Sequence, residues 1–245
     1  MKNKVAIITG GARGIGFGIA TCLARKGVIP VIADMDGAAA QAAAVQFGGQ
    51  GVACDITRRT QVDALVDRTL EQYGRVDILV NNAGICPFVN ILEMGEEMFK
   101  KTIDVNLNGA FHCTQRVGQE MIRLKTPGRI IFITSLSVNV TGAAQGDYGA
   151  SKAGLNMLMK SFAIALGPHG ITCNAVAPGI ILTDMGRSHW EKPENAAFIK
   201  QRVPVGRIGC PEDVGNAVAL LCSDEAAYIN GTSLIVDGGH QAVCA

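Results

Sequence analysis

The stretch VAIITGGARGIG, residues 5–16, determines which fold the rest of the chain is expected to form. Residues 5–9 are apolar or β-branched and predict a buried strand, and a helical pattern begins at Gly14. Glycines between the two permit a tight turn that approaches a ligand closely, and the helix amino terminus attracts a pyrophosphate. A purely structural turn is the alternative, but the strand-then-helix context favours a dinucleotide site. The cofactor contacts expected in this stretch are Gly10, Arg13, Gly14, Ile15 and Gly16.

The rest of the chain alternates short apolar runs with longer helical patterns. Strands are expected at 5–9, 28–33, 51–54, 77–81, 129–134, 171–177 and 233–237. Helices are expected at 14–26, 36–47, 58–73, 96–124 with a break around Asn106–Gly109, 147–167 and 211–223. Several strands are apolar throughout, which indicates a sheet covered on both faces. We therefore predict one domain over residues 1–245: a Rossmann-type α/β fold with a doubly wound parallel seven-stranded sheet and helices on both faces.

The composition of the chain limits the kinds of molecule that it is expected to bind. Among 245 residues there are 22 Lys and Arg against 21 Asp and Glu, without a basic cluster, so nucleic acid is not expected to bind. The eight cysteines are scattered without a CxxC motif, so we expect no disulfide framework. His112, His169 and His240 lack metal-ligand spacing, so we expect no metal site and interpret these histidines as packing or surface residues. Without a signal peptide or an apolar run of ~18 residues, no membrane association is expected and the predicted location is cytoplasmic.

Asp34 ends the second predicted strand, where a carboxylate can accept hydrogen bonds from the adenosine ribose. It would repel a 2′-phosphate, so NAD is the expected cofactor. Arg13 beside the turn can contact such a phosphate, so NADP remains possible. The alternative role for Asp34 is a helix cap, for which Asp36 competes.

The residues that carry out the reaction are expected in the segments 134–137 and 148–152. Tyr148 and Lys152 are spaced i, i+4 in YGASK, which places both side chains on one helix face. An ammonium there should lower the pKa of the phenol, so that Tyr148 exchanges a proton near neutral pH. Ser135 follows a buried strand and should lie at its carboxyl end, where parallel sheets bind ligands.

A series of short motifs, through its order and spacing, makes the chain similar to a known protein family. They are TGGARGIG (9–16), CDI (54–56), NNAG (81–84), DVNLNGAF (104–111), TSLS (134–137), YGASK (148–152) and PGIILTD (178–184). With them the chain resembles the classical short-chain dehydrogenase/reductase family over essentially its whole length. The resemblance implies four catalytic residues, Asn106, Ser135, Tyr148 and Lys152, with Asn106 interrupting its helix to hold a water. Further cofactor contacts implied by it are Asp55, Ile56, Asn81, Asn82, Ala83, Gly84, Tyr148, Lys152, Pro178, Gly179, Ile181 and Thr183.

The substrate site is expected from the irregular segment 179–210 and from polar residues near Ser135 and Tyr148. Ser137 and Gln145 are candidates, with turn or surface polarity as the alternative. His189 and Trp190 are candidates to cover the site, with an amphipathic surface helix as the alternative. Cys86 and Phe88 either border the pocket or pack in the core.

The polarity of this segment suits a polyhydroxylated molecule, since hydroxyls need partners and an indole packs on a sugar face. The segment is similar to that of sugar and polyol dehydrogenases of the family, such as L-rhamnose 1-dehydrogenase-like enzymes. We therefore predict hydride transfer between nicotinamide and a secondary alcohol or carbonyl of a sugar or polyol. The alternatives are a 3-oxoacyl-thioester (acyl-carrier-protein) reductase, which would ordinarily use NADPH, and a non-catalytic dinucleotide sensor.

Family members are mostly tetramers, so the resemblance also implies a homotetramer that pairs helices near 109–124 and 147–167 and the strand near 233–237. The run GLNMLMKSFAIAL (154–166) is apolar nearly all round, which fits burial on two sides. A covered core helix is the alternative explanation for this run.

Overall fold

A computed structural model of the chain describes residues 1–183, 199 and 201–244. Its strands form one parallel sheet in the order β3-β2-β1-β4-β5-β6-β7. The strands are β1 (Val5–Thr9), β2 (Ile29–Asp34), β3 (Gln50–Ala53), β4 (Ile78–Asn81), β5 (Arg129–Ile133), β6 (Thr172–Pro178) and β7 (Ser233–Val236). The order reverses direction between β1 and β4, which opens a ligand crevice at the carboxyl ends of these strands.

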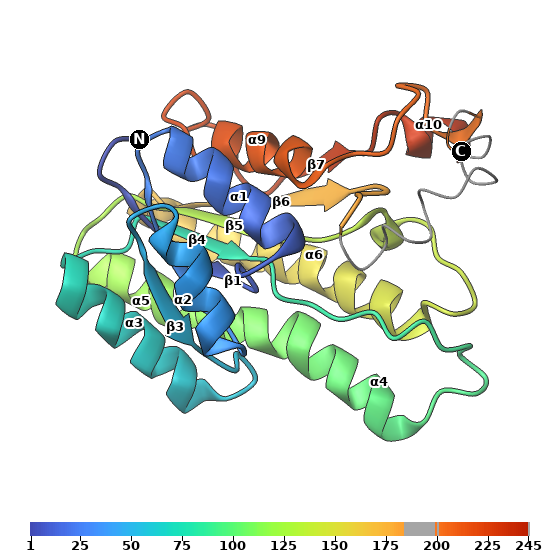
Figure 1. The fold of residues 1–245 in the computed structure, drawn as a ribbon, viewed down its shortest axis with the longest axis horizontal. Helices are drawn as coiled ribbons and strands as arrows, with labels where there is room; N and C mark the ends of the chain where they lie inside the picture. Colours follow the sequence, from blue (N-terminus) through green and yellow to red (C-terminus); the bar gives the residue numbers. More distant parts are fainter. Residues whose placement is uncertain (184–198, 200, 245) are drawn as a thin grey trace.

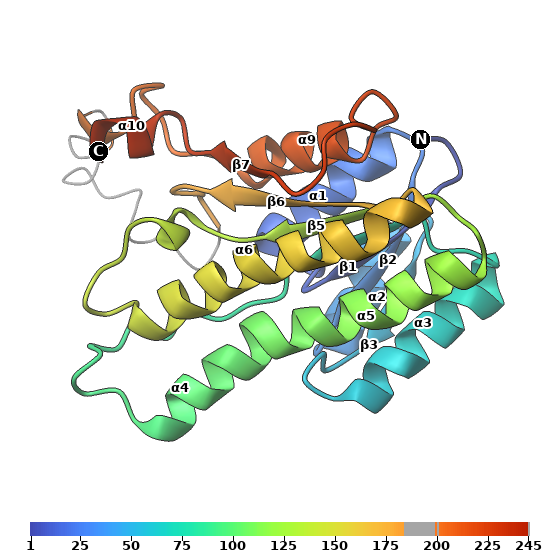
Figure 2. The same cartoon turned by 180° about the vertical axis from the view of Figure 1, so that it is seen from behind.

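Helices cover both faces of the sheet (Figures 1 and 2). One face packs against α1 (Gly14–Arg25), α2 (Gly37–Val45) and α9 (Pro211–Leu221). The opposite face packs against α3 (Arg59–Tyr73), α5 (Gly109–Arg123) and α6 (Gly146–Leu166). Alternate residues of each strand point to opposite faces, and therefore a sheet that is covered twice needs apolar side chains throughout its strands.

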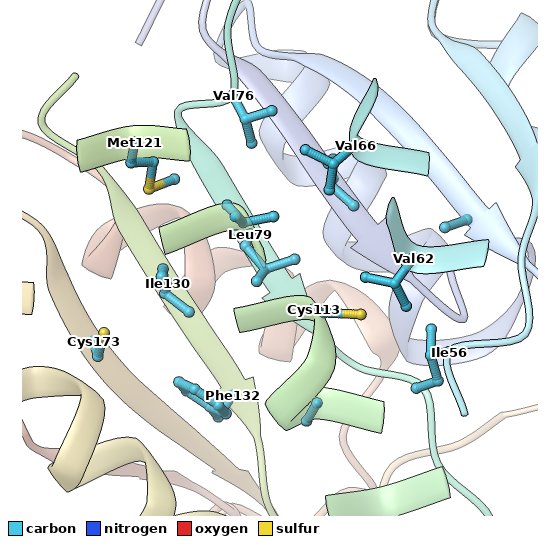
Figure 3. Close-up of a cluster of buried hydrophobic side chains, with 14 of the residues drawn as sticks. Ile56, Val62, Val66, Val76, Leu79, Cys113, Met121, Ile130, Phe132 and Cys173 are labelled. Atoms are coloured by element: carbon cyan, nitrogen blue, oxygen red, sulfur yellow. The ribbon is translucent and has the colours of Figure 1, made fainter. Parts of the chain in front are cut away.

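The two cores follow from this alternation. Within β1, Ile7 contributes to the core beneath α3 and α5, and Ile8 to the core beneath α1 and α9. Figure 3 shows the first core, where Phe132 and Leu79 from neighbouring strands lie beside Cys113 of α5. These side chains are almost fully buried. The packed layers hold the strand ends, and hence the loops after them, in fixed positions.

The predicted fold class is confirmed, and every predicted strand lies within one residue of an observed strand at each end. The break predicted around Asn106–Gly109 is a single π-helical turn, η1 (Asp104–Asn108), between α4 (Glu96–Ile103) and α5. Three elements of the described part of the chain were not predicted: the 3-10 turns η2 (Leu136–Val138) and η3 (Gly167–His169) and the short helix α10 (His240–Cys244). Within the described ranges, no helix is long and apolar enough to cross a bilayer.

Candidate active site

The glycine-rich turn interlocks with the end of β4. Gly10 and Gly14 have φ angles of +61° and +56°, in the left-handed region that favours glycine. A Cβ on Gly16 would lie 2.3 Å from the carbonyl oxygen of Gly10 and 2.6 Å from Nδ2 of Asn82. A larger residue at position 16 would therefore collide with both segments. The turn has the close backbone packing that a dinucleotide cradle needs.

Asn82 and Thr9 fix this contact by hydrogen bonds. The Asn82 amide donates to the carbonyl oxygens of Thr9 and Gly10, both at 2.9 Å. The Thr9 hydroxyl accepts from the backbone N–H of Asn82 at 3.0 Å and of Ala83 at 3.2 Å. Asn82 therefore acts on the cradle through the backbone that it ties down, and Ala83 and Gly84 follow it at the crevice. The neighbouring Asn81 instead points into the core, where its amide donates to Thr114.

Asp34 and Asp36 have separate roles at the end of β2. Asp36 caps α2, with its carboxylate accepting from the backbone N–H of Ala39 at 3.0 Å. Asp34 accepts from the N–H of Ala12 in the glycine-rich turn at 3.3 Å and from that of Asp36 at 3.2 Å. Because the cap belongs to Asp36, Asp34 is free of that role and lies beside the turn. Arg13 is exposed at the start of α1.

Asp55 and Ile56 lie after β3. One carboxylate oxygen of Asp55 accepts from both the N–H of Thr57, at 3.0 Å, and its hydroxyl, at 2.7 Å. Ile56 is buried against Gly109, where a Cβ would approach its side chain to 2.6 Å. This contact holds the loop after β3 against the start of α5.

Ser135, Tyr148 and Lys152 meet at the carboxyl end of β5, as predicted. Lys152 is buried, with its ammonium 5.6 Å from the centroid of the Tyr148 ring. The ammonium donates to the carbonyl oxygen of Ile133, the last residue of β5, at 2.8 Å. Ser135 accepts from the N–H of Ser137 at 3.1 Å, which fixes its hydroxyl beside the phenol.

The electrostatics of this group differ from the expectation. Burial raises the pKa of the Tyr148 phenol, and the hydrogen bond with Ser135 opposes that rise. Burial also lowers the pKa of Lys152 to about 8. The expected lowering of the phenol pKa by the ammonium is therefore not found in the protein alone. The physical reason is that desolvation disfavours both charged forms, while the ammonium is directed at a backbone carbonyl.

Asn106 lies in the π-helical turn and is almost fully buried. Its amide donates to the carbonyl oxygen of Ile85 at 2.9 Å and to the hydroxyl of Ser151 at 3.0 Å. Its side-chain oxygen accepts from the N–H of Ile85 at 2.8 Å. A Cβ on Gly84 would lie 3.2 Å from that oxygen and 3.4 Å from the Lys152 ammonium nitrogen. The close approach at Gly84 thus brings Asn106, Lys152 and the loop after β4 together.

A cavity of about 360 Å³ opens beside Ser135. Five residues predicted for the site line it: Ser135, Ser137, Gln145, Pro178 and Gly179. His240 and Gln241 of α10 line it as well and were missed, because α10 is too short to give a periodic signal and His240 was expected to pack or lie on the surface.

The remaining predicted site residues lie in three parts of the chain. Ile181 pairs with Gly209 in an isolated bridge, and the methyl of Thr183 would lie 3.5 Å from a Cβ on Gly14, so this segment reaches the glycine-rich turn. Cys86 borders the site, with its sulfur 3.9 Å from the Gln145 amide, whereas Phe88 is 64% exposed. His189 and Trp190 lie outside the described residues.

These contacts define a parallel α/β protein with a dinucleotide-type glycine turn and a serine–tyrosine–lysine centre at one sheet edge. A family model described as enoyl-(acyl carrier protein) reductase matches residues 10–241. The chain belongs to the short-chain dehydrogenase/reductase family, and the predictions of that family and of an oxidoreductase are confirmed.

Three similar proteins illustrate the match. An L-rhamnose 1-dehydrogenase (NAD(P)(+)) of Azotobacter vinelandii is 42% identical over 97% of this chain and 96% of its own length. A 3-oxoacyl-[acyl-carrier-protein] reductase of Escherichia coli is 39% identical over 99% of both chains. A solved structure titled "Crystal structure of gox2181" superposes with a TM-score of 0.93 at 39% identity, covering 99% of this chain and 97% of that one.

Proposed function

We propose that this protein is an NAD-linked dehydrogenase that oxidises a secondary alcohol of a sugar or polyol. The observation that carries the proposal is the cavity beside Ser135, whose lining includes Ser137, Gln145, His240 and Gln241. Hydroxyl groups of a substrate need hydrogen-bond partners when they are buried, and these side chains supply them. The 42% identity to a protein named L-rhamnose 1-dehydrogenase supports the same class of substrate.

The catalytic roles follow from where the charge changes. When bound, the nicotinamide supplies the hydride chemistry. In the alcohol-to-carbonyl direction the phenolate form of Tyr148, which burial disfavours in the protein alone, would accept the hydroxyl proton. In the reverse direction Tyr148 and Ser135 donate hydrogen bonds to the oxygen on which charge develops. Lys152 and Asn106 meet at Gly84 beside this centre, and Lys152 keeps a positive charge near the phenol.

The cofactor cradle fits a dinucleotide. Gly10, Gly14 and Gly16 leave room where side chains would otherwise stand, and the amino terminus of α1 begins there. Asp34 would accept from the adenosine ribose, Asp55 and Ile56 would flank the adenine, and the end of β4 and the segment from Pro178 to Thr183 would line the rest. The carboxylate of Asp34 beside the glycine-rich turn favours NAD, and exposed Arg13 leaves NADP use open.

The substrate is tested by turnover. A panel of aldoses and polyols with NAD should be oxidised, whereas 3-oxoacyl thioesters with NADPH should be reduced poorly. Rapid thioester reduction without sugar oxidation would replace the proposal with the acyl reductase that the 39% identical relative is named for. A protein that binds NADH but turns over neither class would be a dinucleotide sensor.

We also propose a cytoplasmic homotetramer. Apolar side chains are exposed on α5, α6 and β7, at Phe111, Met157, Ile164 and Ile235, where a second copy would bury them. The free cysteines among the described residues fit a reducing compartment. Sedimentation should give a tetramer, and a stable monomer would overturn the assembly; cell fractionation tests the location.

A further inference from the structure

The segment Asp237–Gln241, here called the carboxyl-terminal turn, is held in one conformation by its own hydrogen bonds. The two carboxylate oxygens of Asp237 accept from the backbone N–H of Gly239 at 2.8 Å and of Gln241 at 2.7 Å. Gly238 and Gly239 have φ angles of +64° and +88°, which other residues adopt at a cost. The start of α10 is therefore fixed before any ligand binds.

This turn is packed against the loop that leaves β6. Gly179 donates to the carbonyl oxygen of Val236 at 3.0 Å, and a Cβ on Gly179 would lie 2.6 Å from the Cβ of Asp237. Glycine at position 179 is what allows this approach. α10 consequently lies beyond the carboxyl ends of β6 and β7, as Figures 1 and 2 show, and His240 and Gln241 line the cavity that Ser135 also lines.

Both side chains carry a polar atom with unused hydrogen-bonding capacity. Nδ1 of His240 and Oε1 of Gln241 are buried, and neither has a hydrogen-bond partner among the described residues. A buried polar atom without a partner is costly and rare in native proteins. His240 and Gln241 both line the cavity, but these two atoms have almost no accessible surface of their own, so each side chain must turn slightly to present its unpaired atom to a ligand there.

We propose that His240 and Gln241 recognise hydroxyl groups of the substrate other than the one that reacts at Tyr148. An amide oxygen accepts hydrogen bonds, and a histidine Nδ1 donates or accepts according to its tautomer, so the pair matches neutral hydroxyls, which do both. An acyl chain would leave both atoms unpaired, and an anion would be repelled by the amide oxygen. The inference rests on the proposed function and extends it to the residues that select the substrate.

The test compares a substrate with its deoxy analogues. Wild-type enzyme should lose roughly tenfold or more in kcat/KM when the hydroxyl facing Gln241 is removed. Gln241→Leu should lower kcat/KM for the full substrate by a similar factor, mainly through KM, and should no longer distinguish it from the analogue. His240→Leu should do the same for a different hydroxyl. The ratio of kcat/KM for the full substrate to kcat/KM for a simple secondary alcohol such as cyclohexanol should therefore fall in both variants.

Val243→Ala changes a half-exposed residue of the same helix and serves as the control. If Gln241→Leu and His240→Leu keep the wild-type discrimination while sugars or polyols are oxidised, the inference is overturned and the proposed function stands. If wild-type enzyme oxidises no sugar or polyol, the proposed function and the inference both fail. Should a leucine variant not fold, Gln241→Met keeps the length of the side chain and removes the amide; loss of discrimination in Gln241→Met supports the inference, and retention contradicts it.

Discussion

The two ends of the ligand crevice are built in different ways. At the cofactor end, the glycine-rich turn and the end of β4 are joined by hydrogen bonds, in which the side chains of Asn82 and Thr9 pair with neighbouring backbone groups. At the substrate end, His240 and Gln241 keep buried polar atoms without partners among the described residues. Under the proposed function, the dinucleotide would bind to backbone that the protein fixes by itself, and the substrate would bind to side chains that still have hydrogen-bonding capacity. Substitutions at the first end should change stability and cofactor use, and those at the second end should change which substrate is used.

The largest expected effect is on kcat and comes from a substitution at Tyr148, where the cofactor end and the substrate end of the crevice meet. Tyr148→Phe removes the proton-exchanging hydroxyl and should lower kcat by about 10³-fold. NADH affinity should change little, because the phenyl ring remains in place. Steady-state kinetics and NADH fluorescence measure the two quantities. Tyr228→Phe, at a fully exposed tyrosine, is the matched control and should behave as wild type. Retained turnover in Tyr148→Phe would remove the phenol from the mechanism.

The interlock at the cofactor end is tested by Gly16→Ala. The added Cβ would meet the carbonyl oxygen of Gly10 at 2.3 Å, so the turn and the end of β4 must separate. We expect a loss of about 3 kcal/mol in the free energy of unfolding, measured in urea, together with weaker NADH binding. Gly95→Ala is the control, since no atom lies within 4 Å of its added Cβ. Equal stability of the two variants would contradict the interlock.

The sequence predicted best those features that depend on local backbone geometry. The apolar strands and the glycines at 10, 14 and 16 predicted the sheet and its cofactor end, because periodicity and steric needs are local properties of the chain. The same reasoning gave the break near Asn106, which the structure shows as a π-helical turn.

It failed where a property depends on contacts between distant segments. The pKa of Tyr148 is set by burial that residue spacing does not report. His240 and Gln241 enter the pocket because Gly179 lets the carboxyl-terminal turn approach, and no repeat or motif predicts that contact. The separate duties of Asp34 and Asp36 also required the hydrogen bonds to be seen.

The buried ammonium gives a prediction with a defined sign. The pKa of Lys152 falls from 10.5 to about 8 in the folded protein, so between these values the unfolded state binds more protons. Its contribution to the free energy of unfolding therefore rises with pH across this window, by at most about 1.4 kcal/mol per pH unit. Urea unfolding of wild type and Lys152→Met at pH 7.5 and pH 9.5 measures it. Wild type should gain stability relative to the variant at the higher pH, and a constant difference would contradict the lowered pKa.

The smallest expected effect is a change in cofactor preference, which should differ between substitutions of the two aspartates at the end of β2. Asp34→Ser removes a carboxylate that would repel a 2′-phosphate, and the NAD-to-NADP ratio of kcat/KM should fall by about tenfold, or ~1.4 kcal/mol. Asp36→Ser is the matched control: serine also caps a helix, so α2 should persist and the ratio should not change. A ratio that moves equally in both variants would mean that net charge near the turn, and not the position of Asp34, selects the cofactor. Since Asp34 also accepts from Ala12 in the glycine-rich turn, a fall in affinity for both cofactors would assign it instead to the interlock at that end.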